Sequence, residues 1–192
     1  MRQRSGPAIV NCRVSSPGIK GDYWMADPKI GGAILGEACH FVDLMFWVLN
    51  SEFVSVSASS LPLGEGEPIG RNNLVASFRF EDGSVGSLTY CTTGADGGAG
   101  ELFEVFAPGI TTRSENFKKL EIHAGSRIKR SKLYPRKGYL EQMEDFIDSI
   151  RSGTAPKVTV EDGIRSTVVC LQILEAAASG TPRKLDWNSI VK

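Results

Sequence analysis

The chain has 192 residues, of which 41% are hydrophobic and 23% are charged. This length predicts a single domain that buries roughly 70% of the surface of its unfolded chain. Lysine plus arginine and aspartate plus glutamate both number 22, so no net charge attracts the protein to nucleic acid or to an anionic membrane. We therefore expect neither nucleic acid nor a membrane among its partners.

The four cysteines lie far apart and form no CxxC or CxxH pair. This spacing argues against a zinc site and against a disulfide framework, and it favours a reducing cytoplasm. The opening "MRQRSGPAIV" lacks the apolar core of a signal peptide. The longest apolar stretch is too interrupted to span a bilayer. We expect a soluble, cytoplasmic protein without a bound metal.

Segment 8–14 predicts a strand, and a loop rich in turn residues follows at 15–28. Residues 33–49 have the length of a helix, and Gly31 and Gly32 permit a sharp entry into it. A strand block covers 53–124. Its period-two segments lie at 53–59, 73–80, 84–90, 102–108 and 118–124, with a further strand predicted at 109–115.

Two helices close the chain, at 138–152 and 160–179, and each ends at a glycine. The second opens with Thr159 followed by Asp162, close to a capping box. This layout predicts an α+β fold with an open, mainly antiparallel sheet of about six strands. Helices are expected on one face of that sheet, and we expect residues 1–192 to form this one domain.

The glycine-rich segment 94–101, "GADGGAGE", lies between two predicted strands and predicts a flexible hairpin tip. No helix follows it, so no helix N-terminus is available there for a pyrophosphate. The basic run 127–137 predicts a solvated loop or a helix lead-in. We therefore expect no cofactor to bind to this chain alone.

Three polar residues interrupt the apolar helix at 33–49, namely Glu37, His40 and Asp43. At about 100° per residue they step round the helix by about 60° each and form one ridge. Histidine, with an ordinary pKa of about 6.5, suits proton transfer near neutrality, and a carboxylate one turn away could orient its ring. A histidine on a core helix is also commonly structural, so the residues alone leave both interpretations open. His123, which alternates with apolar residues in a strand, is interpreted as a surface position.

The segment "GGAILGEACHFVDLMFWVLN" at 31–50 resembles the signature helix of the glucose–fructose oxidoreductase, inositol dehydrogenase and rhizopine catabolism (Gfo/Idh/MocA) family. The flanking segments and the closing helices resemble that family in the same order, over nearly the whole chain. The resemblance implies a C-terminal α/β domain that supplies substrate contacts and a subunit interface. A separate N-terminal Rossmann domain would bind NAD or NADP. We therefore expect a homo-oligomer formed through the open sheet face, with the Rossmann domain as a further partner.

By the same resemblance, His40 is the acid–base residue that exchanges a proton with a sugar-type hydroxyl while hydride moves to or from the nicotinamide. The family's usual aspartate lies four residues earlier, where this chain has Gly36. Either Glu37 substitutes for it by a local shift, or the aspartate is dispensable. Substrate contacts are expected from Lys20, Asp22, Tyr23, Trp24 and Asp43.

The expected function is that of the C-terminal domain of an NAD(P)-dependent oxidoreductase acting on a sugar, a sugar nucleotide or a polyol. The chain alone is not expected to turn over substrate, because nothing in it positions the cofactor. The alternative is a stand-alone carbohydrate-binding or dimerisation module in which His40 is residual.

Overall fold

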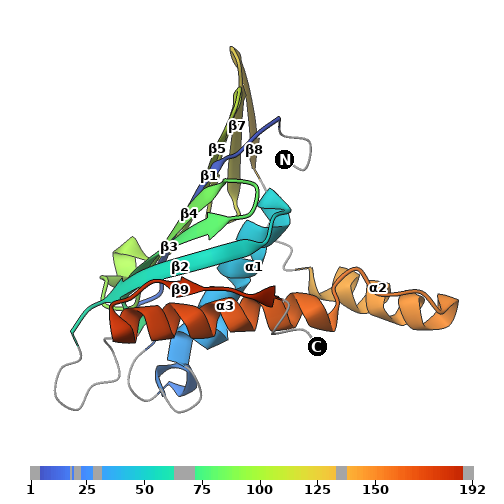
Figure 1. Ribbon diagram of the computed structural model, residues 1–192. Helices are drawn as coiled ribbons and strands as arrows, with labels where there is room; N and C mark the ends of the chain where they lie inside the picture. The colour runs from blue at the N-terminus through green and yellow to red at the C-terminus, as the bar shows by residue number, and fades with distance from the viewer. Residues whose placement is uncertain are drawn as a thin grey trace.

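The computed structural model describes residues 5–17, 19, 23–27, 32–62, 72–132 and 138–187. Strands of these residues form one open sheet in the order β8-β7-β6-β5-β1-β4-β3-β2-β9 (Figure 1). The strands are β1 Ile9–Ser15, β2 Phe53–Ser60, β3 Leu74–Phe80, β4 Val85–Cys91, β5 Gly100–Ala107, β6 Ile110–Glu115, β7 Lys119–Ala124, β8 Arg127–Lys132 and β9 Arg183–Lys184.

Three α-helices accompany the sheet, so the expected α+β class is confirmed. They are α1 Cys39–Leu49, α2 Tyr139–Ser152 and α3 Val160–Ser179. Shorter turns are the 3-10 helices η1 Trp24–Ala26 and η5 Asp96–Gly98 and the π-helix η3 Ile34–Ala38. Among the described residues, no helix combines the length and the apolar character needed to cross a membrane.

The prediction of about six strands is wrong, because the described residues form nine. The three strands beyond the 53–124 block are β1, β8 and β9. The sheet is mixed, since β1 pairs in parallel with β4 and antiparallel with β5. Strand β9 adds only two residues at the edge beside β2.

The position of β1 also overturns the prediction for segment 94–101. Strands β4 and β5 flank β1 and do not pair with each other, so the segment passes across the end of β1 and is not a hairpin tip. It contains the short helix η5. Its glycines therefore serve a connection between separated strands.

The basic run at 127–137 differs from its prediction as well. Residues 127–132 form β8, which pairs with β7, whereas 133–137 lie outside the described residues. Across this pair of strands, Glu121 on β7 accepts a hydrogen bond from Arg130 on β8 at 2.8 Å. The positive charges of residues 127–132 thus belong to a strand at the edge of the sheet.

Alternation of side chains places one face of strands β1 to β5 in the core, whereas β6, β7 and β8 contain no buried residue. Along β3, every second residue is buried and the residues between them are exposed, as expected when successive side chains point to opposite faces. Helices α1 and α3 pack together against the buried face, and α3 contacts β2. The core there includes Val10, Val14, Phe53, Phe78, Leu88, Val105 and Ile173.

Helix α2 does not cover the sheet. Figure 1 shows it beyond the end of α3, pointing away from the strands. The expectation of helices packed on one face therefore holds for α1 and α3 only. Helix α2 ends at Gly153, whose positive φ of 66° suits glycine.

Candidate functional site

The helix expected at 33–49 begins as a π-helix and continues as α1 from Cys39. A π-helix has i→i+5 hydrogen bonds and often occurs at functional sites. The α-helical step of about 100° therefore does not apply across η3. The ridge from Glu37 to Asp43 is regular only in its second half, from His40 onwards.

His40 lies in the first turn of α1 and is exposed, as is Asp43 one turn later. Partial burial of the Asp43 carboxyl and then the negative charge of Asp162 raise its pKa, while Arg165 and His40 act in the opposite direction. These electrostatic interactions place the His40–Asp43 edge of α1 near the first turn of α3.

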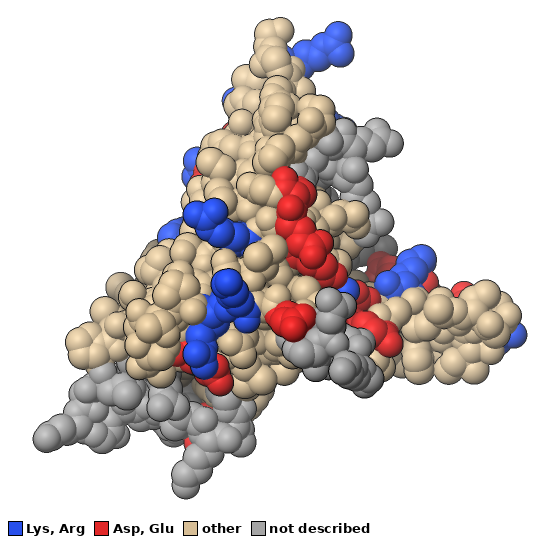
Figure 2. Space-filling view, viewed as in Figure 1, with Lys and Arg blue, Asp and Glu red and all other residues tan. Residues whose placement is uncertain are grey.

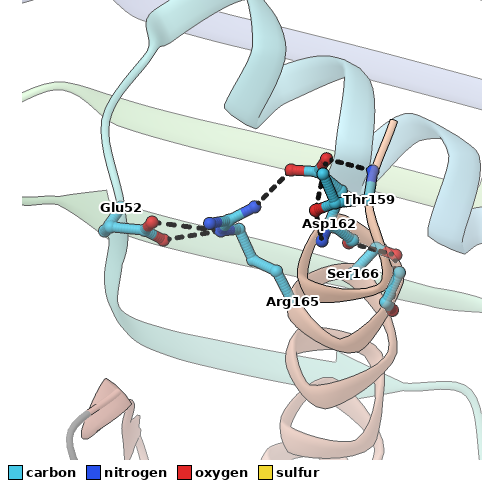
Figure 3. A network of polar contacts seen from close by, with 6 residues as sticks. Glu52, Thr159, Asp162, Arg165 and Ser166 are labelled. Atoms are coloured by element: carbon cyan, nitrogen blue, oxygen red, sulfur yellow. Dashed lines mark hydrogen bonds and ion pairs between the residues drawn. The ribbon is translucent and has the colours of Figure 1, made fainter. Parts of the chain in front are cut away.

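Arg165 joins that first turn of α3 to the rest of the helix layer, as Figure 3 shows. Its Nε donates to both carboxylate oxygens of Glu52, at 3.1 and 3.0 Å, and its Nη1 donates to Asp162 at 2.8 Å. Its guanidinium carbon lies 3.9 Å from the centre of the Phe46 ring. The network therefore holds α3 against α1 and the start of β2.

Asp162 has a second role as part of the helix cap. It accepts a hydrogen bond from the Thr159 backbone N–H at 2.8 Å, and its own N–H donates to the Thr159 hydroxyl at 3.4 Å. The Thr159 hydrogen bonds and then Arg165 lower the pKa of Asp162. Sequence reasoning found this capping box but missed Arg165 and Glu52. Arg165 follows Asp162 by three residues, which is a local signal, whereas Glu52 is 113 residues away.

Glu37 is directed into the molecule. One of its carboxylate oxygens accepts a hydrogen bond from the hydroxyl of Tyr90, a buried residue on the helix-covered face of β4. Burial, followed by this hydrogen bond, raises the pKa of Tyr90. Sequence reasoning missed Tyr90 because alternation in β4 predicts an inward side chain but not its partner.

Gly36 occupies the position four residues before His40, and neighbouring side chains leave no space for a Cβ atom there. A Cβ there would lie 2.9 Å from both Cγ and Sδ of Met25 and 3.3 Å from the indole of Trp24. The short helix η1 thus packs on η3 one turn before His40. A larger side chain at this position requires the Met25 side chain to move.

The structure brings together part of the predicted site. Tyr23 and Trp24 are 43% and 55% exposed, with ring centroids 6.0 Å apart. Through the contact of Trp24 with Gly36, they border the surface that carries His40. Lys20 and Asp22, which were expected to join them, lie outside the described residues.

The glycine-rich segment does not have the surroundings of a dinucleotide-binding turn. The glycine-rich segment 94–101 leads into β5 and not into a helix, so no helix N-terminus meets a pyrophosphate there. A nicotinamide dinucleotide therefore does not fit segment 94–101.

Solved structures show the same fold. Over 94% of this chain, it superposes on 56% of an aldose-aldose oxidoreductase from Caulobacter crescentus complexed with glycerol (TM-score 0.81, 16% identity). It also superposes on 59% of levoglucosan dehydrogenase in complex with NADH and levoglucosan, covering 94% of this chain (TM-score 0.79, 18% identity). The UDP-N-acetylglucosamine 3-dehydrogenase of Acidithiobacillus ferrooxidans matches 91% of this chain with 54% of its own (TM-score 0.74, 16% identity).

The chain thus spans between 54% and 59% of the length of these structures. Comparison with curated proteins finds no match. Residues 7–108, more than half of the chain, match the family model described as the GFO/IDH/MocA C-terminal domain. The matched segment includes β1, the helix with His40, and the central strands. The chain therefore belongs to the GFO/IDH/MocA C-terminal domain family.

Proposed function

We propose that residues 1–192 form the substrate-binding and oligomerisation domain of an NAD(P)-dependent oxidoreductase. The whole protein would act on a hydroxyl or carbonyl group of a sugar, a sugar nucleotide or a polyol. Support comes from the family and from solved structures of the same fold, whose names include an aldose-aldose oxidoreductase and a UDP-N-acetylglucosamine dehydrogenase. The cofactor would be held by residues outside this chain.

His40 is the proposed acid–base residue, and its position carries the proposal. It is exposed at the start of α1, one turn after Gly36, which η1 covers. A substrate hydroxyl at this surface can pass its proton to the imidazole and receive it back, and histidine is the side chain best suited to this exchange near neutral pH. Asp43, also exposed, follows one turn later on α1.

Glu37 is the proposed substitute for the carboxylate that Gly36 cannot provide. Its hydrogen bond from Tyr90 fixes the direction of the side chain, so Tyr90 would act as a positioning residue. Glu37→Gln is expected to lower kcat, and Tyr90→Phe is expected to lower it less while changing its pH profile. Unchanged kcat in both variants would show that the enzyme works without this carboxylate.

The test of His40 uses the full-length protein. His40→Ala is expected to lower turnover at least ~100-fold, the lower end for a general acid–base group, with an unchanged circular dichroism spectrum. The matched control is His123→Ala, which alters the other of the chain's two histidines, a partly exposed residue on β7 beside Glu121. Near-normal turnover of His40→Ala would contradict the assignment.

Substrate contact is proposed for Tyr23 and Trp24, together with Lys20, Asp22 and Asp43. Exposed aromatic faces suit the C–H faces of a sugar ring, whereas charged groups bind its hydroxyls. Trp24→Ala is expected to raise KM more than it lowers kcat. An unchanged KM would place the substrate elsewhere.

The open face of the sheet is the proposed surface for self-association. One row of cross-strand partners runs over eight strands, through Ser57, Ser77, Ser87, Asn11, Glu104, Arg113, Glu121 and Arg130. Small uncharged polar side chains, three serines and Asn11, fill one half of this row, and alternating charges fill the other. A second copy rotated by 180° can therefore place opposite charges together.

Exposed apolar side chains border that row, including Ile9, Val75, Val85, Phe106 and Ile128. A hollow of about 350 Å³ is lined by Ile9 and Val85 together with Ser57, Ser77 and Ser87. Val75→Asp combined with Phe106→Asp is expected to turn an oligomer into a monomer in analytical ultracentrifugation. An unchanged sedimentation coefficient would contradict this interface.

The second candidate is a stand-alone carbohydrate-binding or dimerisation module in which His40 is residual. A reading frame upstream of Met1 that encodes a GxGxxG unit supports the oxidoreductase. Calorimetry on the 192-residue chain provides a second comparison. We expect no NAD(H) binding, and micromolar binding would reveal a nucleotide site within the chain.

A further inference from the structure

The turn between β6 and β7 has an unusual backbone. Asn116 and Phe117 both have positive φ values, of 50° and 52°, and the Lys118 N–H closes the turn on the Glu115 carbonyl at 2.9 Å. A turn with two central residues of positive φ is usually built from glycine, asparagine or aspartate. Asparagine therefore suits its position, whereas phenylalanine stands where glycine is common. A bulky residue with positive φ is an outlier, and strained residues concentrate at binding sites.

Contacts with β5 hold this turn in place. The Asn116 N–H donates to the Glu101 carbonyl at 2.8 Å, and the side-chain oxygen of Asn116 accepts from the Glu101 N–H at 2.7 Å. Gly100 makes room for this carboxamide, because a Cβ atom at position 100 would overlap it. A strained conformation persists only where its surroundings fix it in this way. Gly100 and Asn116 together therefore keep Phe117 in its position.

Phe117 lies beside the first turn of α1. Its ring is stacked on the ring of Phe41, with the two centroids 6.4 Å apart and the planes 27° from parallel. Phe41 directly follows His40 in the chain and is 6% exposed, whereas Phe117 is 41% exposed. Phe41 is thus part of the core, and Phe117 extends the aromatic surface outwards, next to the turn of α1 that carries His40.

A second aromatic group reaches the same helical segment. Trp24 is 55% exposed and approaches Gly36, one turn before His40. Exposed rings from two distant segments therefore contact the chain directly before and directly after the proposed acid–base residue. Aromatic rings bind flat apolar surfaces. A cyclic sugar presents such a surface through its C–H groups, whereas an open-chain polyol does not.

We propose that Phe117 is a specificity-determining residue of the His40 site and that it selects a sugar in its cyclic form. This inference rests on the proposed function, and it narrows the substrate class from sugars and polyols to sugar rings. The aromatic face of Phe117 packs on the C–H face of the sugar. The hydroxyl groups at the edge of the sugar remain free to meet polar side chains, including His40.

Binding of two matched compounds to the full-length protein tests the proposal. D-Glucose and D-glucitol have the same carbon skeleton, but glucose is a ring and glucitol is an open chain. NMR titration is expected to show tighter binding of glucose. Phe117→Leu keeps an apolar side chain against Phe41, and it is expected to weaken glucose binding about 5-fold, the size of one aromatic contact. Phe117→Tyr keeps the ring and is expected to bind glucose as the unaltered protein does.

Further variants separate recognition from folding. Phe117→Gly suits the positive φ and is expected to fold, with an unchanged circular dichroism spectrum, yet to lose the preference for glucose. Asn116 is a positioning residue, and Asn116→Gly loses only its side-chain hydrogen bond with Glu101. The ratio of the two affinities is expected to fall less in this variant than in Phe117→Leu. Phe146→Leu is the matched control, since Phe146 is 50% exposed on α2, and both affinities are expected to stay unchanged.

Equal binding of the two compounds by the unaltered protein, or binding of neither, would overturn the proposal. So would unchanged glucose affinity in Phe117→Leu, and so would a loss in Phe117→Tyr as large as that in Phe117→Leu. The readout does not require turnover. A protein that binds glucose through Phe117 but has no oxidoreductase activity would contradict the proposed function and retain the sugar-ring site. An active enzyme whose Phe117→Leu variant keeps its sugar preference would contradict this inference alone.

Discussion

The two faces of the sheet have the same strands and the same alternation, yet they differ in what covers them. On the helix side, Val10, Phe78 and Val105 are no more than 2% exposed. On the open side, Ile9 and Phe106 on the same strands as Val10 and Val105 are 48% and 39% exposed. The pattern of apolar residues therefore marks two surfaces to be buried, and this domain buries only one of them by itself.

Charged groups show the same difference. Arg165 on the helix side is 19% exposed and reaches Glu52 and Asp162. Arg130 on the open side is 67% exposed and pairs with Glu121 on the neighbouring strand, β7. The first pair fixes helices in place, whereas the second remains in solvent, where ion pairs contribute little.

The largest expected contrast is between two phenylalanines. Phe78→Ala removes a ring that is 2% exposed, packed against Phe53, and should cost about 3–5 kcal/mol of stability. Phe106→Ala, on the open face, should cost under ~1 kcal/mol in the monomer because its ring is already partly solvated. Urea unfolding at low protein concentration measures both. Equal losses would show that the open face is covered in the monomer.

The next contrast compares the two arginines. Arg165→Met leaves the Glu52 and Asp162 carboxylates without their partner and should cost about 1–3 kcal/mol. Arg130→Met should leave the midpoint of urea unfolding unchanged within error, because its pair is exposed. Raising the salt concentration should weaken only the second pair appreciably. A negligible effect of Arg165→Met would show that the network contributes little to the stability of the fold.

Acid unfolding tests the role of Asp162. Its folded-state pKa lies below the ordinary value of 3.8, so it contributes stability that is present above that value and is lost as the pH falls through the folded pKa. Asp162→Asn should therefore flatten the loss of stability between about pH 4 and pH 2. At neutral pH it should cost less than Arg165→Met, because an amide oxygen can still accept the hydrogen bond from the Thr159 N–H. An unchanged pH profile would contradict this contribution.

The smallest effect is expected for Gly36→Ala. Alanine favours a helix by about 0.5–1 kcal/mol over glycine, but its Cβ must displace the flexible Met25 side chain. The net change in stability should be below ~1 kcal/mol, while the indole N–H resonance of Trp24 should shift. Gly97→Ala, where an added Cβ meets nothing within 4 Å, is the control. An unmoved Trp24 resonance would show that η1 and η3 are not coupled.

Much of the fold could be predicted because its signals are local. Six strands of the 53–124 block follow from alternation and turns, and the cap of α3 follows from Thr159 and Asp162. The predicted number of strands was too low partly because β8 is rich in lysine and arginine, and because β9 has only two residues. Neither has the apolar alternation that identifies a strand.

The candidate site also has some features that the local sequence predicts and others that depend on tertiary contacts. His40 and its spacing from Asp43 are features of one helix, so they could be predicted before any tertiary contact was known. Tyr90 lies 53 residues from Glu37 in the chain, and no local pattern joins them. The π-helical start of the segment was also missed, since helical periodicity does not distinguish η3 from α-helix over five residues.

Short-range order in this protein thus comes from the sequence: alternating strands, capped helices and a histidine on a polar ridge. Long-range order comes from packing: the insertion of β1 between β4 and β5, the Glu52–Arg165 pair and the contact of η1 with Gly36. The reason is physical. Periodicity and capping depend on neighbours within one or two turns, whereas partners across the sheet are selected only when the whole core assembles.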